Sequence, residues 1–250
     1  MYAVVGTWPD IAYTISYLAR FMANYGHAHW EAVKWVIRYL KETKDVKLVL
    51  RKGGTLTWEE ADRQSWLGVK GYSGANGNLQ KHCHAYYVFC IDGGAISWNS
   101  RKQAIISLST MESEYITMTH AVKETIWMCM FLGEILHPLY NPMLLYYNNQ
   151  SPITVVKDDQ FHTRTKHIDI CYHFIWEAIM RNILEVRYCP TQHMITDIFT
   201  KALPVKTFEQ LCMLLGIYVD WESVLLFIRQ AHTVAQKIVS MFPDLNIIAS

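Results

Sequence analysis

The 250-residue sequence has almost no excess charge and no paired cysteine motif. It contains 23 Lys and Arg against 22 Asp and Glu, so its formal net charge is +1. This balance excludes a global basic field, and any contact with nucleic acid must come from local basic patches. The six cysteines are scattered without a CxxC pair. Their spacing argues against a disulfide framework or a zinc module and favours free thiols in a reducing compartment.

Long hydrophobic runs are also absent. No apolar run approaches the roughly 18–20 residues that a membrane-spanning helix needs. The N-terminal MYAVVGTWPD has no basic region followed by an apolar stretch, so we expect no signal peptide. These absences predict an intracellular protein, cytoplasmic or nuclear, without a membrane partner. Hydrophobic residues nevertheless make up 51% of the chain, enough for one large domain or a domain with an extension.

The first 52 residues predict a helical segment. Apolar residues recur at helical spacing in two runs within residues 8–41, separated by a turn at Gly26. The first run is Ile11, Ile15, Leu18 and Met22, and the second is Trp30, Val33, Ile37 and Leu40. Residues 53–65 begin with the paired glycines Gly53 and Gly54, and we assign them to a linker.

Residues 66–218 predict an α/β domain. Short strands are expected at 67–71, 85–91 and 95–98, with a hairpin turn at Asp92-Gly93. A long helix follows, opened by Ser109 and Glu112 in a capping-box pattern. Strands at 143–147 and 184–188 alternate with helices at 150–157, 168–180, 195–201 and 207–215. This order predicts a mixed five-stranded sheet flanked by helices, as in RNase H-like folds.

The last segment, residues 219–250, predicts a helical tail. Apolar residues recur at helical spacing in it, at Val224, Ile228, Ala231, Ala235, Ile238 and Phe242. Three interpretations stay open: the tail docks on the domain, binds a partner, or has no evolved partner.

Five sequence blocks occur together in order along the chain. They are HWEAVKWVIRYLKET (29–43), GGAISWNSRKQ (93–103), LSTMESEY (108–115), HTRTKHIDICYHFI (162–175) and TDIFTKALP (196–204). With them the chain resembles the C-terminal part of Ty1/copia-type retrotransposon polyproteins from about residue 2 to residue 218. The resemblance implies the end of a reverse transcriptase followed by an RNase H-like domain. The aspartate-pair motif of the polymerase is absent, so we expect a fragment that cannot polymerise.

The resemblance implies a nuclease site with four carboxylates that hold two Mg²⁺ ions and hydrolyse RNA in RNA–DNA hybrids. The four corresponding positions are Gly74, Glu114, Asn148 and Asp197. Glycine offers no side-chain oxygen, and the amide of Asn148 carries no charge. We therefore expect Glu114 and Asp197 to be vestigial metal ligands, no productively bound Mg²⁺, and a pseudoenzyme.

Two alternatives stay open beside the pseudoenzyme. One is a non-catalytic module that binds nucleic acid, with weak affinity for an RNA–DNA hybrid, or a protein partner that the sequence does not identify; no small-molecule cofactor is expected. Its candidate phosphate contacts, which could equally form a solvated basic rim, are Arg101, Lys102, Arg164, Lys166 and Lys201. The other is a weak Mg²⁺- or Mn²⁺-dependent ribonuclease in which Asp92 or His193 supplies a further ligand. Trp98 either stacks on a base or packs in the core.

Overall fold

The computed structural model describes residues 4, 6–50, 69–76, 84–103, 107, 109–135, 141–150 and 166–218. Apart from Gln150, the helix predicted at 150–157 lies outside these residues, and so does the predicted helix of the C-terminal tail. The N-terminal segment forms the two predicted helical regions, of which the first is divided into short pieces. Its elements are η1 (Pro9–Ile11), α2 (Ala12–Leu18), η2 (Ala19–Phe21) and α3 (His27–Glu42).

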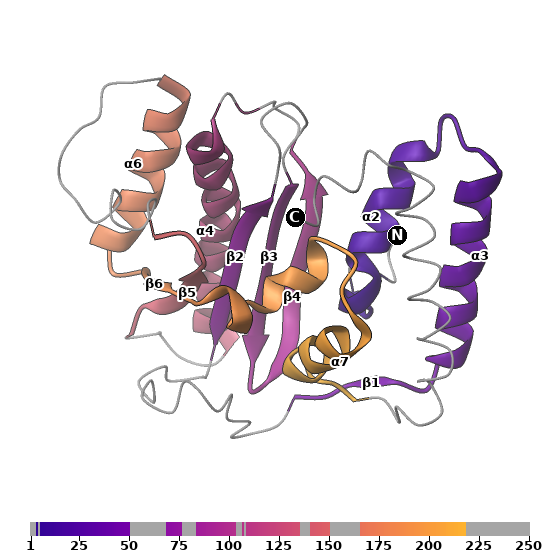
Figure 1. The fold of residues 1–250 in the computed structure, drawn as a ribbon. Coiled ribbons are helices and arrows are strands. Elements are labelled where there is room, and N and C mark those ends of the chain that lie inside the picture. The colour runs from indigo at the N-terminus through magenta and orange to yellow at the C-terminus, as the bar shows by residue number, and fades with distance from the viewer. Residues whose placement is uncertain are drawn as a thin grey trace.

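The central sheet has the predicted five strands in mixed orientation (Figure 1). They are β2 (Lys70–Asn76), β3 (His84–Ile91), β4 (Gly94–Lys102), β5 (Met143–Tyr147) and β6 (Leu184–Tyr188). Their order in the sheet is β4-β3-β2-β5-β6. Strands β2, β3 and β4 are antiparallel neighbours, whereas β5 runs parallel to β2 and β6 runs parallel to β5. The fold is α/β and RNase H-like, as predicted.

The turn between β3 and β4 follows the sequence signal. Asp92 has a φ of 48° and Gly93 a φ of 75°. Two successive residues with positive φ are typical of the hairpin turn that suits the right-handed twist of strands. The predicted hairpin is confirmed.

Helices cover both faces of the sheet (Figure 1). On one face lie α4 (Thr110–Ile135) and α6 (Lys166–Met180), which bury a core cluster of Phe89, Met118, Leu145 and Ile175 with their neighbours. The N–H of Glu112 donates to Ser109 Oγ at 3.1 Å, which confirms the predicted cap of α4. The opposite face carries η3 (Thr191–His193), η4 (Ile195–Phe199) and α7 (Val205–Leu214).

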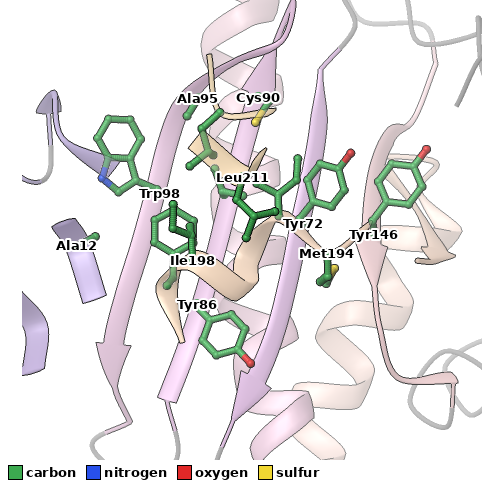
Figure 2. Close-up of a cluster of buried hydrophobic side chains, with 14 of the residues drawn as sticks. Ala12, Tyr72, Tyr86, Cys90, Ala95, Trp98, Tyr146, Met194, Ile198 and Leu211 are labelled. Carbon is green, nitrogen blue, oxygen red and sulfur yellow. The ribbon is translucent and has the colours of Figure 1, made fainter. Parts of the chain in front are cut away.

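A second core cluster lies under η4 and α7. Figure 2 shows Ile198 and Leu211 from these elements against Tyr72 and Tyr86 of the sheet. The rings of Tyr72 and Tyr146 stack with their centroids 5.1 Å apart. This cluster fixes η4 to the sheet and so positions the fourth predicted acid.

The N-terminal segment packs against the sheet domain. Strand β1 (Lys47–Leu48) pairs antiparallel with β7 (Ile217–Tyr218), two short strands that the sequence did not predict. Trp98 is 7% exposed and its indole N–H donates to the carbonyl of Val4 at 2.7 Å. Trp98 is therefore a packed residue and not a base-stacking one.

Cysteine usage and membrane topology were also predicted. The described cysteines, Cys90, Cys129, Cys171, Cys189 and Cys212, are free thiols. Among the helices of the described residues, none combines the length and hydropathy that crossing a bilayer requires.

Candidate functional site

The first and third predicted acid positions meet at one edge of the sheet. The carboxyl ends of the parallel strands β2 and β5 lie there, and the paired residues end at Ser73 and Tyr147. Gly74 follows Ser73 in the sequence, and Asn148 follows Tyr147. A Cβ built on Gly74 would lie 3.4 Å from Asn148 Oδ1. The structure thus brings the two positions side by side, and neither offers a carboxylate.

An aromatic ring occupies the space beside Gly74. Tyr86 is the residue opposite Gly74 on β3 and is 4% exposed. A Cβ on Gly74 would lie 3.0 Å from Tyr86 Cε2, closer than most such contacts. The ring of Tyr86 therefore packs against the bare backbone of Gly74, and a side chain there requires the ring to move slightly.

Glu114, on α4, reaches the same edge from the other face. Its Oε2 accepts hydrogen bonds from the hydroxyl of Tyr147 and, at 3.2 Å, from the N–H of Ala75. Its Oε1 accepts from Asn149 Nδ2 at 3.3 Å. The carboxylate therefore ties α4 to the ends of β2 and β5. Tyr147 and Asn149 were not predicted as site residues. The sequence feature that could have indicated them is a phenol and an amide at the end of an apolar strand.

Burial changes the acidity of Glu114. Removal from water raises the pKa of the carboxyl above its ordinary value, although the hydrogen bonds from Tyr147, Asn149 and Ala75 oppose this rise. Asp10, buried and bonded to Tyr39, has its pKa raised for the same reason. Glu114 is thus a largely desolvated carboxyl that accepts three hydrogen bonds.

Asp197, the fourth predicted acid, lies in η4 with its side chain 20% exposed. Lys201 Nζ lies 3.2 Å from Asp197 Oδ2, so the acid forms an ion pair with a residue one turn later. The sequence predicted Asp197 as a vestigial metal ligand and Lys201 as a phosphate contact, and in the structure these two residues bind each other.

The described residues do not fit a two-Mg²⁺ centre. Magnesium takes oxygen ligands in octahedral geometry and is held in proteins mainly by carboxylates. Both oxygens of Glu114 accept hydrogen bonds, and within the described ranges no three His, Cys, Asp or Glu side chains lie close enough to hold one ion. Asp92 and His193 were the candidate further ligands. Asp92 lies in the β3–β4 turn, at the far end of β3 from Gly74. His193 lies in η3, and among the described residues it belongs to no group of three possible metal ligands.

The predicted basic residues are only partly brought to this edge. Arg101 and Lys102 are exposed at the end of β4. The register pairs Lys102 with His84, and His84 in turn with Asn76 at the end of β2. Arg101 also lies near His120 of α4. Burial lowers the pKa of His120, and the positive charges of Lys123 and Arg101 lower it further. Arg164 and the side chain of Lys166 lie outside the described residues.

The environment of Glu114 predicts a pH effect on stability. A carboxyl with a pKa raised on folding holds its proton more tightly in the folded state. The free energy of unfolding therefore falls as the pH rises from the ordinary pKa through the raised one. We expect the free energy of unfolding of Glu114→Gln to fall less with rising pH than that of the natural chain. The remaining fall is the part due to Asp10. Urea titrations at several pH values from acid to neutral measure both. Glu177→Gln, at a half-exposed glutamate of α6, is the control; identical pH slopes for all three proteins would contradict the assignment.

Comparison with known proteins gives retroelement relatives. The chain is 39% identical over 222 residues to the Retrovirus-related Pol polyprotein from transposon TNT 1-94 of Nicotiana tabacum, which covers 87% of this chain and 16% of that protein. It is 31% identical over 212 residues to the corresponding polyprotein from transposon RE2 of Arabidopsis thaliana, with 84% of this chain and 14% of that protein covered. The chain therefore spans less than a fifth of the length of these curated relatives.

Among solved structures, the chain is similar to a foamy viral protease-reverse transcriptase dRH in complex with ds DNA. The TM-score is 0.44 with 15% sequence identity, over 76% of this chain and 30% of that chain. No protein-family model matches the sequence.

Proposed function

Because the chain belongs to the family of copia- and Ty1-type retrotransposon Pol polyproteins, we propose that it is an RNase H-like module that has lost the hydrolysis of RNA in RNA–DNA hybrids. One observation carries the proposal. The two strand ends at which the site needs acids hold Gly74 and Asn148, side by side.

Charge explains why this loss matters. Two divalent ions bring four positive charges, whereas Glu114 and Asp197 together supply two negative ones. Asp197 is already paired with Lys201, and Glu114 is surrounded by three hydrogen-bond donors. The remaining acids therefore act as structural groups, and Mg²⁺, which supplies the nucleophilic water in the family's chemistry, has no adequate ligand set.

The proposal is tested by incubating the purified chain with a labelled RNA–DNA hybrid, in Mg²⁺ and separately in Mn²⁺. We expect no cleavage above that of the Glu114→Gln variant in either ion. Cleavage that Glu114→Gln abolishes would overturn the proposal and would support a weak ribonuclease.

A second candidate function is residual hybrid binding without cleavage. It is favoured by Arg101 and Lys102, which lie exposed along the same sheet edge as Gly74 and Asn76. Neutralised phosphates release counterions, so binding through these residues weakens steeply with salt.

Binding at this edge gives a quantitative expectation. The double variant Arg101→Ala, Lys102→Ala should lower the affinity for hybrid and reduce the slope of log K against log salt by about 2. The control is Lys41→Ala, Lys206→Ala, which makes the same charge change at exposed positions on α3 and α7. Equal affinities of the two double variants, measured by fluorescence anisotropy, would contradict binding at this edge.

A further inference from the structure

The second half of β4 turns alternate side chains toward α4. Ser97 Oγ donates a hydrogen bond to Glu124 Oε1 of this helix at 2.6 Å. Just beyond the strand, Gln103 Nε2 donates to Thr117 Oγ1 of the same helix at 3.0 Å. Arg101 lies between these two contacts and, by the alternation of a strand, on the same face as both. Its side chain therefore points to the part of α4 between residues 117 and 124.

Two further basic residues lie on this part of α4. His120 is one helical turn before Glu124, and Lys123 is its neighbour at the next turn, so the two share one side of the helix. Lys123 Nζ lies 5.9 Å from the ring centroid of Phe174, an uncharged residue of α6. We name Arg101, His120 and Lys123 the α4 basic cluster; all three residues are exposed.

The α4 basic cluster gathers like charges around an imidazole. Partial burial lowers the pKa of His120, and the positive charges of Lys123 and Arg101 lower it further. Among the described residues, the charges that shift this pKa are therefore positive. The nearest acid along the helix, Glu124, is engaged elsewhere, because its two oxygens accept hydrogen bonds from hydroxyl groups of β3 and β4. Basic groups that repel one another cost free energy, and a bound anion removes that cost.

The cluster lies close to the sheet edge at which Gly74 and Asn148 meet. Glu114 reaches this edge from α4, and His120 follows it about 9 Å further along the helix axis. Phosphate is the anion that a nucleic acid at this edge offers. Arginine binds phosphate through a planar fork, whereas lysine and protonated histidine each add charged donors. The three residues of the cluster therefore suit a backbone phosphate.

We propose that Arg101, His120 and Lys123 form a phosphate-binding site for the backbone of an RNA–DNA hybrid. The inference rests on the second candidate function, hybrid binding without cleavage, and extends its contacts from the end of β4 onto α4. His120 binds phosphate as the imidazolium ion, so the chain takes up a proton when the site is filled. Hybrid binding then depends on pH through one residue of α4.

The sign of this pH dependence follows from the charges. A phosphate on the cluster favours protonated His120, so the pKa of His120 is higher in the complex than in the free chain, where its neighbours lower it. The affinity therefore rises as the pH falls through the interval between these two pKa values. Tyr87 of β3, which bonds Glu124, stays neutral throughout, because burial raises the pKa of Tyr87 to about 12.

The test measures the affinity for a labelled hybrid by fluorescence anisotropy from about pH 8 to about pH 5.5. We expect the natural chain to bind severalfold more tightly at the acid end. Because the chain contains 11 histidines, two variants are compared. His120→Gln should lose most of this gain, whereas His27→Gln, at a largely exposed histidine of α3, should keep it. Equal pH dependence of the two variants would overturn the site on α4 alone; no hybrid binding at any pH would overturn the second candidate function as well.

A second comparison tests the contribution of Lys123. Lys123→Gln should weaken hybrid binding and lower the slope of log K against log salt by about 1. Lys206→Gln, which removes the same charge from an exposed position on α7, should do neither. Equal affinities and slopes of these two variants would overturn the proposal.

An NMR titration of the His120 imidazole separates phosphate binding from a merely structural role. We expect the pKa of His120 to be higher in the full chain bound to hybrid than in the free chain. A structural role would leave this pKa unchanged on binding, and that result would overturn the proposal even if His120→Gln binds hybrid more weakly.

Discussion

The double variant Gly74→Asp, Asn148→Asp is expected to cleave RNA in an RNA–DNA hybrid at least about 10²-fold faster than the natural chain, an effect of the size that one lost electrostatic contact has in an active site. The reason is geometric. The two positions are neighbours, since a Cβ on residue 74 lies 3.4 Å from Asn148 Oδ1. Two added carboxylates there would complete four acids with Glu114 and Asp197. The measurement is release of labelled RNA fragments in Mg²⁺.

The backbone tolerates this reversion, but the packing resists it slightly. Gly74 is not among the described residues with positive φ, so an aspartate there meets no backbone strain. Its Cβ would lie 3.0 Å from Tyr86 Cε2, and the ring must yield by a few tenths of an ångström.

The matched control for the reversion is Gly74→Ala, Asn148→Asp, which introduces the same Cβ and one acid fewer. We expect this control to stay inactive. Equal activity of the two double variants would show that an acid at residue 74 is not needed. A folded but silent Gly74→Asp, Asn148→Asp variant would show that these two acids do not account for the loss of activity.

The strands show which part of the fold the sequence could predict. Strands β5 and β6 have the predicted limits because each is an apolar run bounded by turn residues. Strand β2 was predicted at 67–71 but is described at Lys70–Asn76. Its second half, Ser73 to Asn76, consists of small and polar residues with low strand propensity, and it is held in the sheet by pairing with β3. Pairing between distant residues overrides local propensity here.

Helix α3 shows a different limit. Its periodicity correctly predicted a helix but not the side that packs. Of the predicted apolar run, Trp30 and Ile37 are exposed and Leu40 is partly buried, whereas Ala32 and Tyr39 on the neighbouring side are buried. A hydrogen bond between Tyr39 and Asp10, far apart in sequence, helps to fix this choice. Periodicity contains no information about such a contact.

The candidate site was predictable in position and not in detail. The resemblance placed residues 74, 114, 148 and 197, and the structure brings 74 and 148 together at the strand ends. The partners of Glu114 lie 33, 35 and 39 residues away, at Tyr147, Asn149 and Ala75. Which donors meet this carboxylate depends on how α4 is placed against the sheet, and that placement results from core packing.

Gly216→Ala is expected to lower the free energy of unfolding by about 3 kcal/mol or more, through backbone strain and overpacking together. Gly216 has a φ of +79°, a conformation that side chains rarely adopt. An added Cβ would lie 2.6 Å from the carbonyl oxygen of Val49 and 2.7 Å from Gly94 Cα. Both are backbone atoms, so no side chain can rotate away to relieve the clash.

The control is a glycine-to-alanine substitution at another position, for which we expect the free energy of unfolding to rise. Gly133 lies in α4 with nothing within 4 Å of an added Cβ, so Gly133→Ala should raise the free energy of unfolding by about 0.5–1 kcal/mol. Urea denaturation followed by circular dichroism measures both variants. An unchanged midpoint for Gly216→Ala would contradict the close packing at this residue.

The position of Gly216 gives the measurement a further meaning. The N–H of Val49 donates to the Gly216 carbonyl at 2.8 Å, and the N–H of Ala95 donates to the Leu215 carbonyl at 2.9 Å. The same stretch of backbone therefore joins the N-terminal helical segment to the first residues of β4. Because both connections pass through it, we expect Gly216→Ala to shift the unfolding of both parts together. A variant in which the N-terminal helices melt first, while the sheet keeps its natural midpoint, would show that the two parts fold as separate units.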